Sequence, residues 1–375
     1  MARVPFAGFL RNPRSSADRL EELTDFGSNP GKLRARIFTP EGVADRPALV
    51  VVLHGCTQTA AGYDAGSGWS TLADEQGFLL LFPEQQRANN PNLCFNWFSQ
   101  GDIRRGEGEA LSICQMIATL VRDHDADPAR VFITGLSAGG AMTSVMLATY
   151  PEVFAGGAII AGLPYGTAKG VPQALERMTG QGMPNEQALG GLVRKASSHA
   201  GPWPTLSVWH GSSDPTVNAI NAEAILAQWR SVQGLTNASL SSDTVDGFPH
   251  HSWRDANNCA VLEYHDITGM AHGTPLHSKE RNPCGVPGPY FLDVGISSTR
   301  RIAAFWGLTN EREARDVPPT RPVIPAERPQ PRRSNLPIVR TLRAERIYEA
   351  TPKPAATTGV GKIIEDALRA AGLMK

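Results

Sequence analysis

Residues 135–139, which read GLSAG, are the part of this sequence best suited to nucleophilic chemistry. They match the Gly-x-Ser-x-Gly pattern, which holds a serine hydroxyl on a sharp turn between a strand and a helix. The flanking sequence fits, because residues 131–134 form an apolar, β-branched run and residues 138–148 have a helical composition. The simpler alternative is a glycine-rich turn with an incidental serine. The order of strand, turn and helix favours Ser137 as a nucleophile, whose partners should follow it in the chain.

A serine hydroxyl becomes reactive when a base takes its proton and a third group fixes the tautomer of that base. On an α/β scaffold the acid and then the histidine follow the serine, each on a loop after a strand. Asp214 fits this position, because it follows the predicted strand 205–211 at a glycine turn. Its alternative role is to cap the next helix. The other acidic candidates follow no such strand; they are Asp243, Asp246 and Asp266.

The base must come from nine histidines. His272 follows a strand in the segment TGMAHGTPL, whose glycines allow a loop to carry an imidazole over the edge of a sheet. His265 lies inside a predicted strand, and His250 and His251 are predicted to lie in a polar loop beside Pro249. A solvated loop histidine is the alternative for His272. With the serine and aspartate in place, His272 is the favoured base.

Acyl transfer also needs two N–H groups that face the developing negative charge. Ala138 directly follows the nucleophile and is expected to supply one of them. The other is expected from the turn at residues 54–56, which reads HGC and follows an early apolar run. In this turn, His54 is expected to have a supporting role rather than that of a second base.

The elements that would position these residues form an α/β pattern. Continuous apolar runs, typical of strands buried on both faces, alternate with helical patterns from residue 33 to residue 306. The sequence therefore predicts a mostly parallel sheet with helices on both faces. The predicted strands are at residues 33–40, 48–54, 78–82, 131–134, 156–162, 205–211 and 260–268, and the predicted helices at 69–76, 110–121 and 221–232.

Four regions are predicted. A polar extension (1–31) precedes the catalytic domain (32–307), which is followed by a proline-rich linker (308–338) and a basic tail (339–375). The tail has an amphipathic helical pattern and is expected to dock back on the domain, or on a partner, membrane or polymer surface. A hydrophobic content of 41% and zero net charge argue against nucleic-acid binding. No apolar run suits a transmembrane helix, and the N-terminal residues lack the features of a secretory signal.

Several segments in order resemble the polyhydroxybutyrate (PHB) depolymerase family of esterases, which has feruloyl and acetylxylan esterases as relatives. They include LHGCTQTAAGYDAGSGW, CFNWFSQGDIRRGEGEALSI, the segment around GLSAG, and ITGMAHGTPL. The resemblance implies an α/β-hydrolase fold with Ser137, Asp214 and His272 as the catalytic triad. It further implies that Cys56 and Ala138 supply the oxyanion hole.

The same resemblance implies that the aromatic residues of CFNWF line the ester-binding cleft. Trp97 and Phe98, together with His54, are therefore the expected substrate-binding residues; simple packing is the alternative for the aromatic pair. The expected activity is that of a serine esterase that cleaves PHB-type polyester, its oligomers or related short-chain esters. A small-ester hydrolase of the feruloyl or acetylxylan type, an acyltransferase and a catalytically silent binding protein are the alternatives.

The five cysteines bear on the cellular compartment. Cys56 and Cys94 lie in two loops that should meet over the cleft, and they are candidates for a disulfide. Cys259 and Cys284 are candidates for a second disulfide, while Cys114 lies on an apolar helical stripe. Two disulfides would suit an extracellular or periplasmic protein, with a cytoplasmic one as the alternative. Neither zinc-ligand spacing nor a phosphate-binding loop occurs, so no metal or cofactor is expected.

Overall fold

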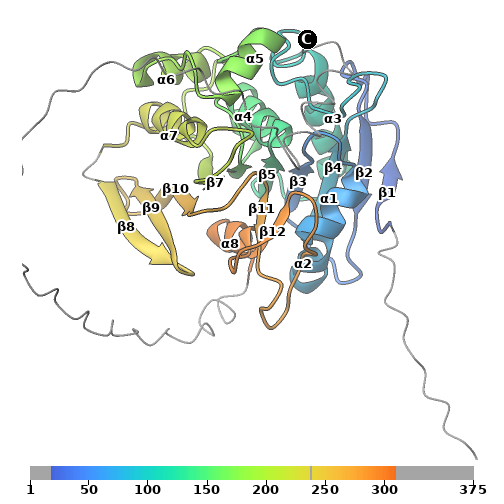
Figure 1. Cartoon of the computed structure of the whole chain (residues 1–375). Coiled ribbons are helices and arrows are strands. Elements are labelled where there is room, and N and C mark those ends of the chain that lie inside the picture. Colours follow the sequence, from blue (N-terminus) through green and yellow to red (C-terminus); the bar gives the residue numbers. More distant parts are fainter. Residues whose placement is uncertain (1–17, 237–238, 310–375) are drawn as a thin grey trace, which may run out of the picture.

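A computed structural model describes residues 18–236 and 239–309. Nearly all of the predicted linker, the basic tail with its helix and most of the N-terminal extension lie outside the described residues. Within them, the dominant element is a sheet of ten strands in the order β1-β2-β4-β3-β5-β6-β7-β10-β9-β8 (Figure 1). The strands are β1 (Glu21–Leu23), β2 (Arg34–Phe38), β3 (Leu49–Leu53), β4 (Leu79–Glu84), β5 (Val131–Leu136), β6 (Gly156–Ile160), β7 (Thr205–Gly211), β8 (Leu240–Val245), β9 (Phe248–Arg254) and β10 (Ala260–Ile267).

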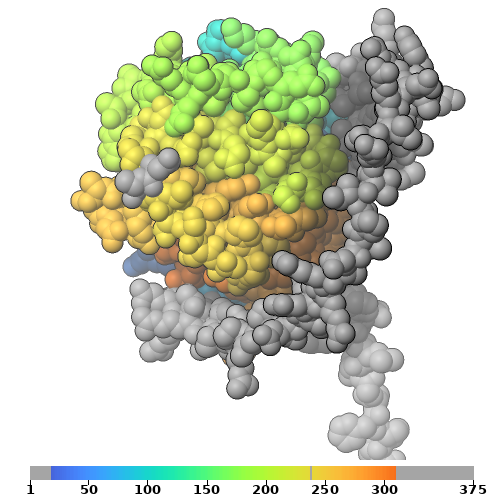
Figure 2. All heavy atoms as spheres, turned by 60° about the vertical axis from the view of Figure 1, so that its left-hand side comes forward, coloured from blue at the N-terminus to red at the C-terminus, as the bar shows by residue number. Residues whose placement is uncertain are grey.

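The centre of the sheet is parallel and both of its edges are antiparallel. Strands β4, β3, β5, β6, β7 and β10 pair in this order and run parallel to one another. On one side β2 and β1 add antiparallel pairs, and on the other β9 and β8 extend the sheet as an antiparallel hairpin. The predicted mostly parallel sheet is therefore confirmed. Figure 2 is turned toward the side that carries this hairpin.

Helices cover both faces of the sheet, because its central strands bury their side chains on both sides. In β3, Leu49, Val51 and Leu53 belong to one hydrophobic cluster, whereas Val50 and Val52 belong to the other. The first cluster includes side chains of α3 (Gly108–Asp123), α4 (Ala138–Thr149), α5 (Val171–Met178), α6 (Glu186–Arg194) and α7 (Ile220–Gln233). The second includes side chains of α1 (Ala60–Ser67), α2 (Trp69–Gln76) and α8 (Ser298–Phe305).

One local prediction is wrong: His250 and His251 lie in strand β9, not in a polar loop. The preceding Pro249 pairs only with Thr244 of β8, and the ladder between β9 and β10 begins at His250. Pro249 therefore lies just outside the β9–β10 ladder, where a residue without a backbone N–H is tolerated.

A second small sheet, absent from the predictions, joins β11 (Thr274–Leu276) to β12 (Phe291–Asp293) in parallel. No helix among the described residues is long and apolar enough to cross a membrane.

Candidate active site

Ser137 occupies a strained turn between β5 and α4. Its φ of +58° and ψ of −117° are uncommon for a residue with a side chain. Two glycines allow the turn, since a Cβ at Gly135 would lie 2.4 Å from the backbone of Gly139. A Cβ at Gly139 would lie 2.3 Å from the carbonyl oxygen of Leu53 in β3. The sequence pattern thus reflects a close approach of three backbone segments, which holds Ser137 at the carboxyl end of β5.

Asp214 and His272 come together from loops that follow β7 and β10. Oδ2 of Asp214 lies 2.6 Å from Nδ1 of His272. Oδ1 of Asp214 accepts the N–H groups of Thr216 and Val217 at 2.8 and 2.9 Å, which fixes the carboxylate in its turn. The alternative role of Asp214 as a helix cap does not apply, because α7 begins after Ala219.

His210, which sequence reasoning did not select, also contacts this carboxylate. It is buried at the end of β7, and its Nε2 lies 3.5 Å from Oδ2 of Asp214 and 2.8 Å from the carbonyl oxygen of Val217. Burial alone would raise the pKa of Asp214, but the contacts with His210 and His272 outweigh it and hold that pKa well below its usual range. Asp214 therefore remains ionised and favours a proton on Nδ1 of His272. In the sequence, the signal for His210 was its position four residues before Asp214 in the segment HGSSD.

A cleft of about 350 Å³ contains both Ser137 and His272 in its lining. The predicted cleft residues Trp97 and Phe98 also line it, with their rings 5.5 Å apart in an edge-to-face arrangement. Helix α5 adds a second set of apolar lining side chains that the sequence did not reveal: Val171, Ala174, Leu175 and Met178. The cleft can therefore hold an apolar group next to Ser137.

Of the two expected oxyanion residues, one lines this cleft and the other directly follows Ser137. Cys56 is part of its lining, and Ala138 is the first residue of α4. Among the described residues, no hydrogen-bond acceptor faces the backbone N–H of either residue. Neither N–H group is therefore committed to a hydrogen bond within the described residues, which is a precondition for an oxyanion hole.

The disulfide between Cys56 and Cys94 is confirmed. It joins the loop after β3 to the loop that carries Trp97, and the N–H of Thr57 donates to the carbonyl oxygen of Asn92 at 2.7 Å beside it. The predicted second pair is wrong, since Cys259 and Cys284 are both free. Cys259 is exposed in the turn between β9 and β10. Cys284 is buried next to Ser297, with its Sγ 3.6 Å from that hydroxyl.

His54 does not bind substrate in the way predicted, because it is almost fully buried and does not line the cleft. Its Nε2 accepts the N–H of Gln85 at 3.1 Å, so the proton is on Nδ1, which donates to the carbonyl oxygen of Gly55 at 2.8 Å. Burial lowers the pKa of His54 and keeps the imidazole neutral. Its role is to fix the turn that carries Cys56, as the sequence also suggested.

Glu109, at the start of α3, supports the loop that carries the cleft residue Trp97. Its carboxylate accepts the backbone N–H and the side-chain amide of Asn96, both at 2.8 Å, and the amide of Gln85 at 2.6 Å. Burial raises the pKa of Glu109 to about 8, against the lowering effect of these hydrogen bonds. Because Asn96 directly precedes Trp97, this network sets the position of an aromatic residue of the cleft.

Comparison with known proteins identifies the family. The family model described as Esterase PHB depolymerase matches residues 33–246. This chain belongs to that family. The poly(3-hydroxyalkanoate) depolymerase C of Paucimonas lemoignei is 47% identical over 296 residues, which cover 78% of this chain and 71% of the relative. Acetylxylan esterase A of Aspergillus oryzae is 32% identical over 72% of this chain and 90% of its own.

A solved structure agrees with the fold. The acetyl xylan esterase from Aspergillus awamori matches with a TM-score of 0.66 and 25% identity, over 77% of this chain and 99% of that one. The expected family and α/β-hydrolase fold are thus confirmed. As a member of the PHB depolymerase family, the chain is a carboxylic ester hydrolase.

Proposed function

We propose that the chain hydrolyses 3-hydroxyalkanoate polyester and its oligomers through an acyl-enzyme on Ser137, with Asp214 and His272 completing a triad. The observation that carries the proposal is the apolar cleft, which contains Ser137 and a histidine already oriented by a buried carboxylate.

The reaction would proceed in two stages. Nε2 of His272 accepts the proton of the Ser137 hydroxyl while Oγ attacks the ester carbonyl carbon. The N–H groups of Cys56 and Ala138 stabilise the negative oxygen of the tetrahedral intermediate. His272 then returns the proton to the departing alcohol, which leaves an acyl-enzyme. Water, deprotonated by the same imidazole, attacks that carbonyl, and the acid is released as the proton returns to Ser137.

The chemistry of the cleft walls supports an aliphatic ester. Trp97 and Phe98 line the same cleft as apolar side chains of α5, among them Leu175 and Met178. Such walls suit the short alkyl branches of a hydroxyalkanoate, whereas the hydroxyl groups of a sugar would lose hydrogen bonds to water there. The identity of 47% to a poly(3-hydroxyalkanoate) depolymerase supports the same substrate class.

We further propose that the protein acts in an oxidising compartment outside the cytoplasm, because the disulfide Cys56–Cys94 joins two loops of the cleft. Recovery of the protein from the cytoplasm with all five cysteines as free thiols, rather than three, would contradict this. Thiol titration of the protein isolated from its native compartment measures the difference directly.

The substrate proposal is tested by release of 3-hydroxybutyrate from its oligomers and by clearing of a PHB suspension, with acetylated xylan as the competing substrate. The account expects both polyester activities and their loss in Ser137→Ala. Hydrolysis of acetylated xylan or p-nitrophenyl butyrate without activity on hydroxybutyrate oligomers would refute the substrate class. Transfer of the acyl group to an added alcohol in preference to water would indicate an acyltransferase.

A further inference from the structure

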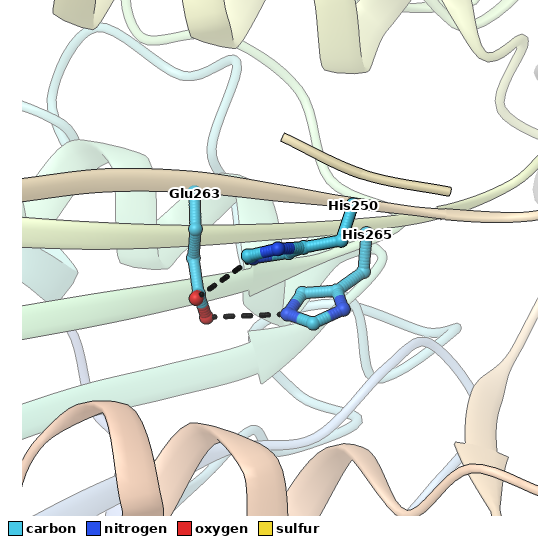
Figure 3. Close-up of side chains that lie close together, drawn as sticks. All are labelled: His250, Glu263 and His265. Carbon is cyan, nitrogen blue, oxygen red and sulfur yellow. Dashed lines mark hydrogen bonds and ion pairs between the residues drawn. The ribbon is translucent and has the colours of Figure 1, made fainter. Parts of the chain in front are cut away.

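Three side chains that the proposed reaction does not use converge on one face of the sheet beside the β8–β9 hairpin (Figure 3). They are His250 of β9 and Glu263 and His265 of β10. His250 and His265 are direct cross-strand partners, and Glu263 lies two residues before His265. Residues two apart on a strand share a face. One ligand atom from each residue lies within 4.8 Å of the others, and none of the three residues lines the Ser137 cleft.

The distances within this cluster match the separation of ligands around one metal ion. Nε2 of His250 lies 3.3 Å from Oε2 of Glu263, and Nε2 of His265 lies 3.3 Å from Oε1 of the same carboxylate. The His250–Glu263 contact is also a hydrogen bond, but a long one, because such bonds between charged N–H and carboxylate groups are usually about 2.7–2.9 Å. Two ligands of a tetrahedral Zn²⁺, each about 2.0–2.1 Å from the ion, lie about 3.3 Å apart.

Neighbouring groups orient the ligand atoms in the way that metal sites require. Oδ1 of Asp243 lies 2.6 Å from Nδ1 of His250, which leaves Nε2 of that imidazole for the cluster. The hydroxyl of Ser207 donates to Oε1 of Glu263 at 2.6 Å and accepts the indole N–H of Trp209 at 2.7 Å. A carboxylate behind the histidine and a hydroxyl behind the carboxylate thus support two of the three ligands.

The third ligand is fixed by stacking. The ring of His265 lies flat on the indole of Trp209, with 3.7 Å between the ring centroids. Its Nδ1 is buried and has no hydrogen-bond partner within the described part of the chain. The polar contact of this ring is therefore made by Nε2, the atom that faces Glu263.

Charge also favours a cation here. Glu263 is buried and Asp243 lies behind His250, so two carboxylates meet two imidazoles. A buried carboxylate is costly unless a positive charge balances it. A divalent ion balances the buried carboxylate of Glu263 while the two histidines stay neutral, which is the form that binds metal; Asp243, whose side chain is 62% exposed, is also hydrated.

We propose that His250, Glu263 and His265 bind one Zn²⁺ ion, with water at the fourth position. Two imidazole nitrogens and one carboxylate oxygen are a ligand set that zinc commonly takes. The ion would cross-link β9 to β10 and so fasten the antiparallel hairpin to the parallel sheet. Sequence reasoning missed this site because its ligands are brought together by cross-strand pairing, not by a local spacing.

The full chain is treated with EDTA, dialysed, mixed with Zn²⁺ and passed through a desalting column, and bound zinc is measured by mass spectrometry. The account expects about one zinc per chain and a higher melting temperature with zinc. Bound Co²⁺ should give the visible absorption of a tetrahedral site. Asp243→Asn should weaken zinc binding about 10–100-fold, and His265→Gln should abolish it.

His251→Gln is the matched control, because His251 neighbours His250 on β9 but points to the opposite face. It should bind zinc as the wild type does. Hydrolysis of p-nitrophenyl butyrate checks that each variant is folded, since the cluster does not line the cleft. The proposal is overturned if the wild type retains no zinc, or if the Asp243 and His265 variants, folded by that criterion, bind zinc as tightly as His251→Gln.

Discussion

Replacing Asp214 by Asn removes one charge and leaves the shape of the site unchanged. The amide oxygen can keep the role of Oδ1, which accepts the N–H groups of Thr216 and Val217 at 2.8 and 2.9 Å. The amide NH₂ then replaces Oδ2, which lies 2.6 Å from Nδ1 of His272 in the wild type. Because the amide NH₂ donates a hydrogen bond, Nδ1 of His272 must accept it. The imidazole then carries its proton on Nε2 and cannot accept the hydroxyl proton of Ser137.

The expected loss follows from this wrong tautomer. Interference of this kind in a serine triad lowers kcat about 10⁴-fold, which corresponds to about 5.5 kcal/mol of transition-state stabilisation. The lowered pKa of Asp214 determines the pH range over which the wild type and the Asp214→Asn variant should differ in activity. A depressed pKa means that the wild-type carboxylate contributes fully above its ordinary pKa and loses its effect only as the pH falls further. The difference between wild type and variant should therefore persist throughout the neutral range.

The assay is the initial rate of p-nitrophenyl butyrate hydrolysis at neutral pH, with circular dichroism as a check of folding. Asp246→Asn is the matched control, because Asp246 is exposed and pairs with Arg301 on the surface. It should retain activity within about two-fold of wild type. If a folded Asp214→Asn protein keeps more than about a tenth of wild-type kcat, the assigned role of Asp214 is wrong.

Three other predictions concern the walls of the site. Replacing Cys56 and Cys94 together by serine opens a 38-residue loop and should lower the free energy of unfolding by about 3–4 kcal/mol, measured in urea; an unchanged transition midpoint would contradict this. Trp97→Leu should raise KM for a butyrate ester about five-fold at nearly constant kcat, and an unchanged KM would remove Trp97 from the substrate contacts. Gly139→Ala brings a Cβ to 2.3 Å from a β3 carbonyl oxygen and should lower kcat about 100-fold or more. Gly191→Ala, where no atom lies within 4 Å, should leave activity unchanged.

The centre of the fold was predictable because its strands are buried on both faces. Continuous apolar runs such as Leu49–Leu53 cannot lie at a surface, and the glycine pattern around Ser137 has meaning only at a crowded strand–helix turn. Both features leave a local signature in the sequence. Asp214 and His272 could be selected for the same reason, since each follows a recognisable strand.

The remaining features depend on contacts between distant segments. The β8–β9 hairpin has a mostly exposed polar strand and a proline, so its sequence resembles a loop. The sequence suggested a disulfide between Cys259 and Cys284, and only the fold shows that Cys259 is exposed in a turn whereas Cys284 is buried. His54 follows a strand as a catalytic residue would, yet its ring turns inward to hold Gly55 and Gln85.

Covalent labelling shows whether Ser137 is the nucleophile. The full chain is treated with a fluorophosphonate probe, residual esterase activity is followed, and the labelled peptide is mapped by mass spectrometry. The account predicts a single adduct on Ser137, formed in proportion to the loss of activity and absent from Ser137→Ala, which should itself be at least about 10³-fold less active. Full activity in the Ser137→Ala protein, or inactivation with the probe on another residue, would contradict the account.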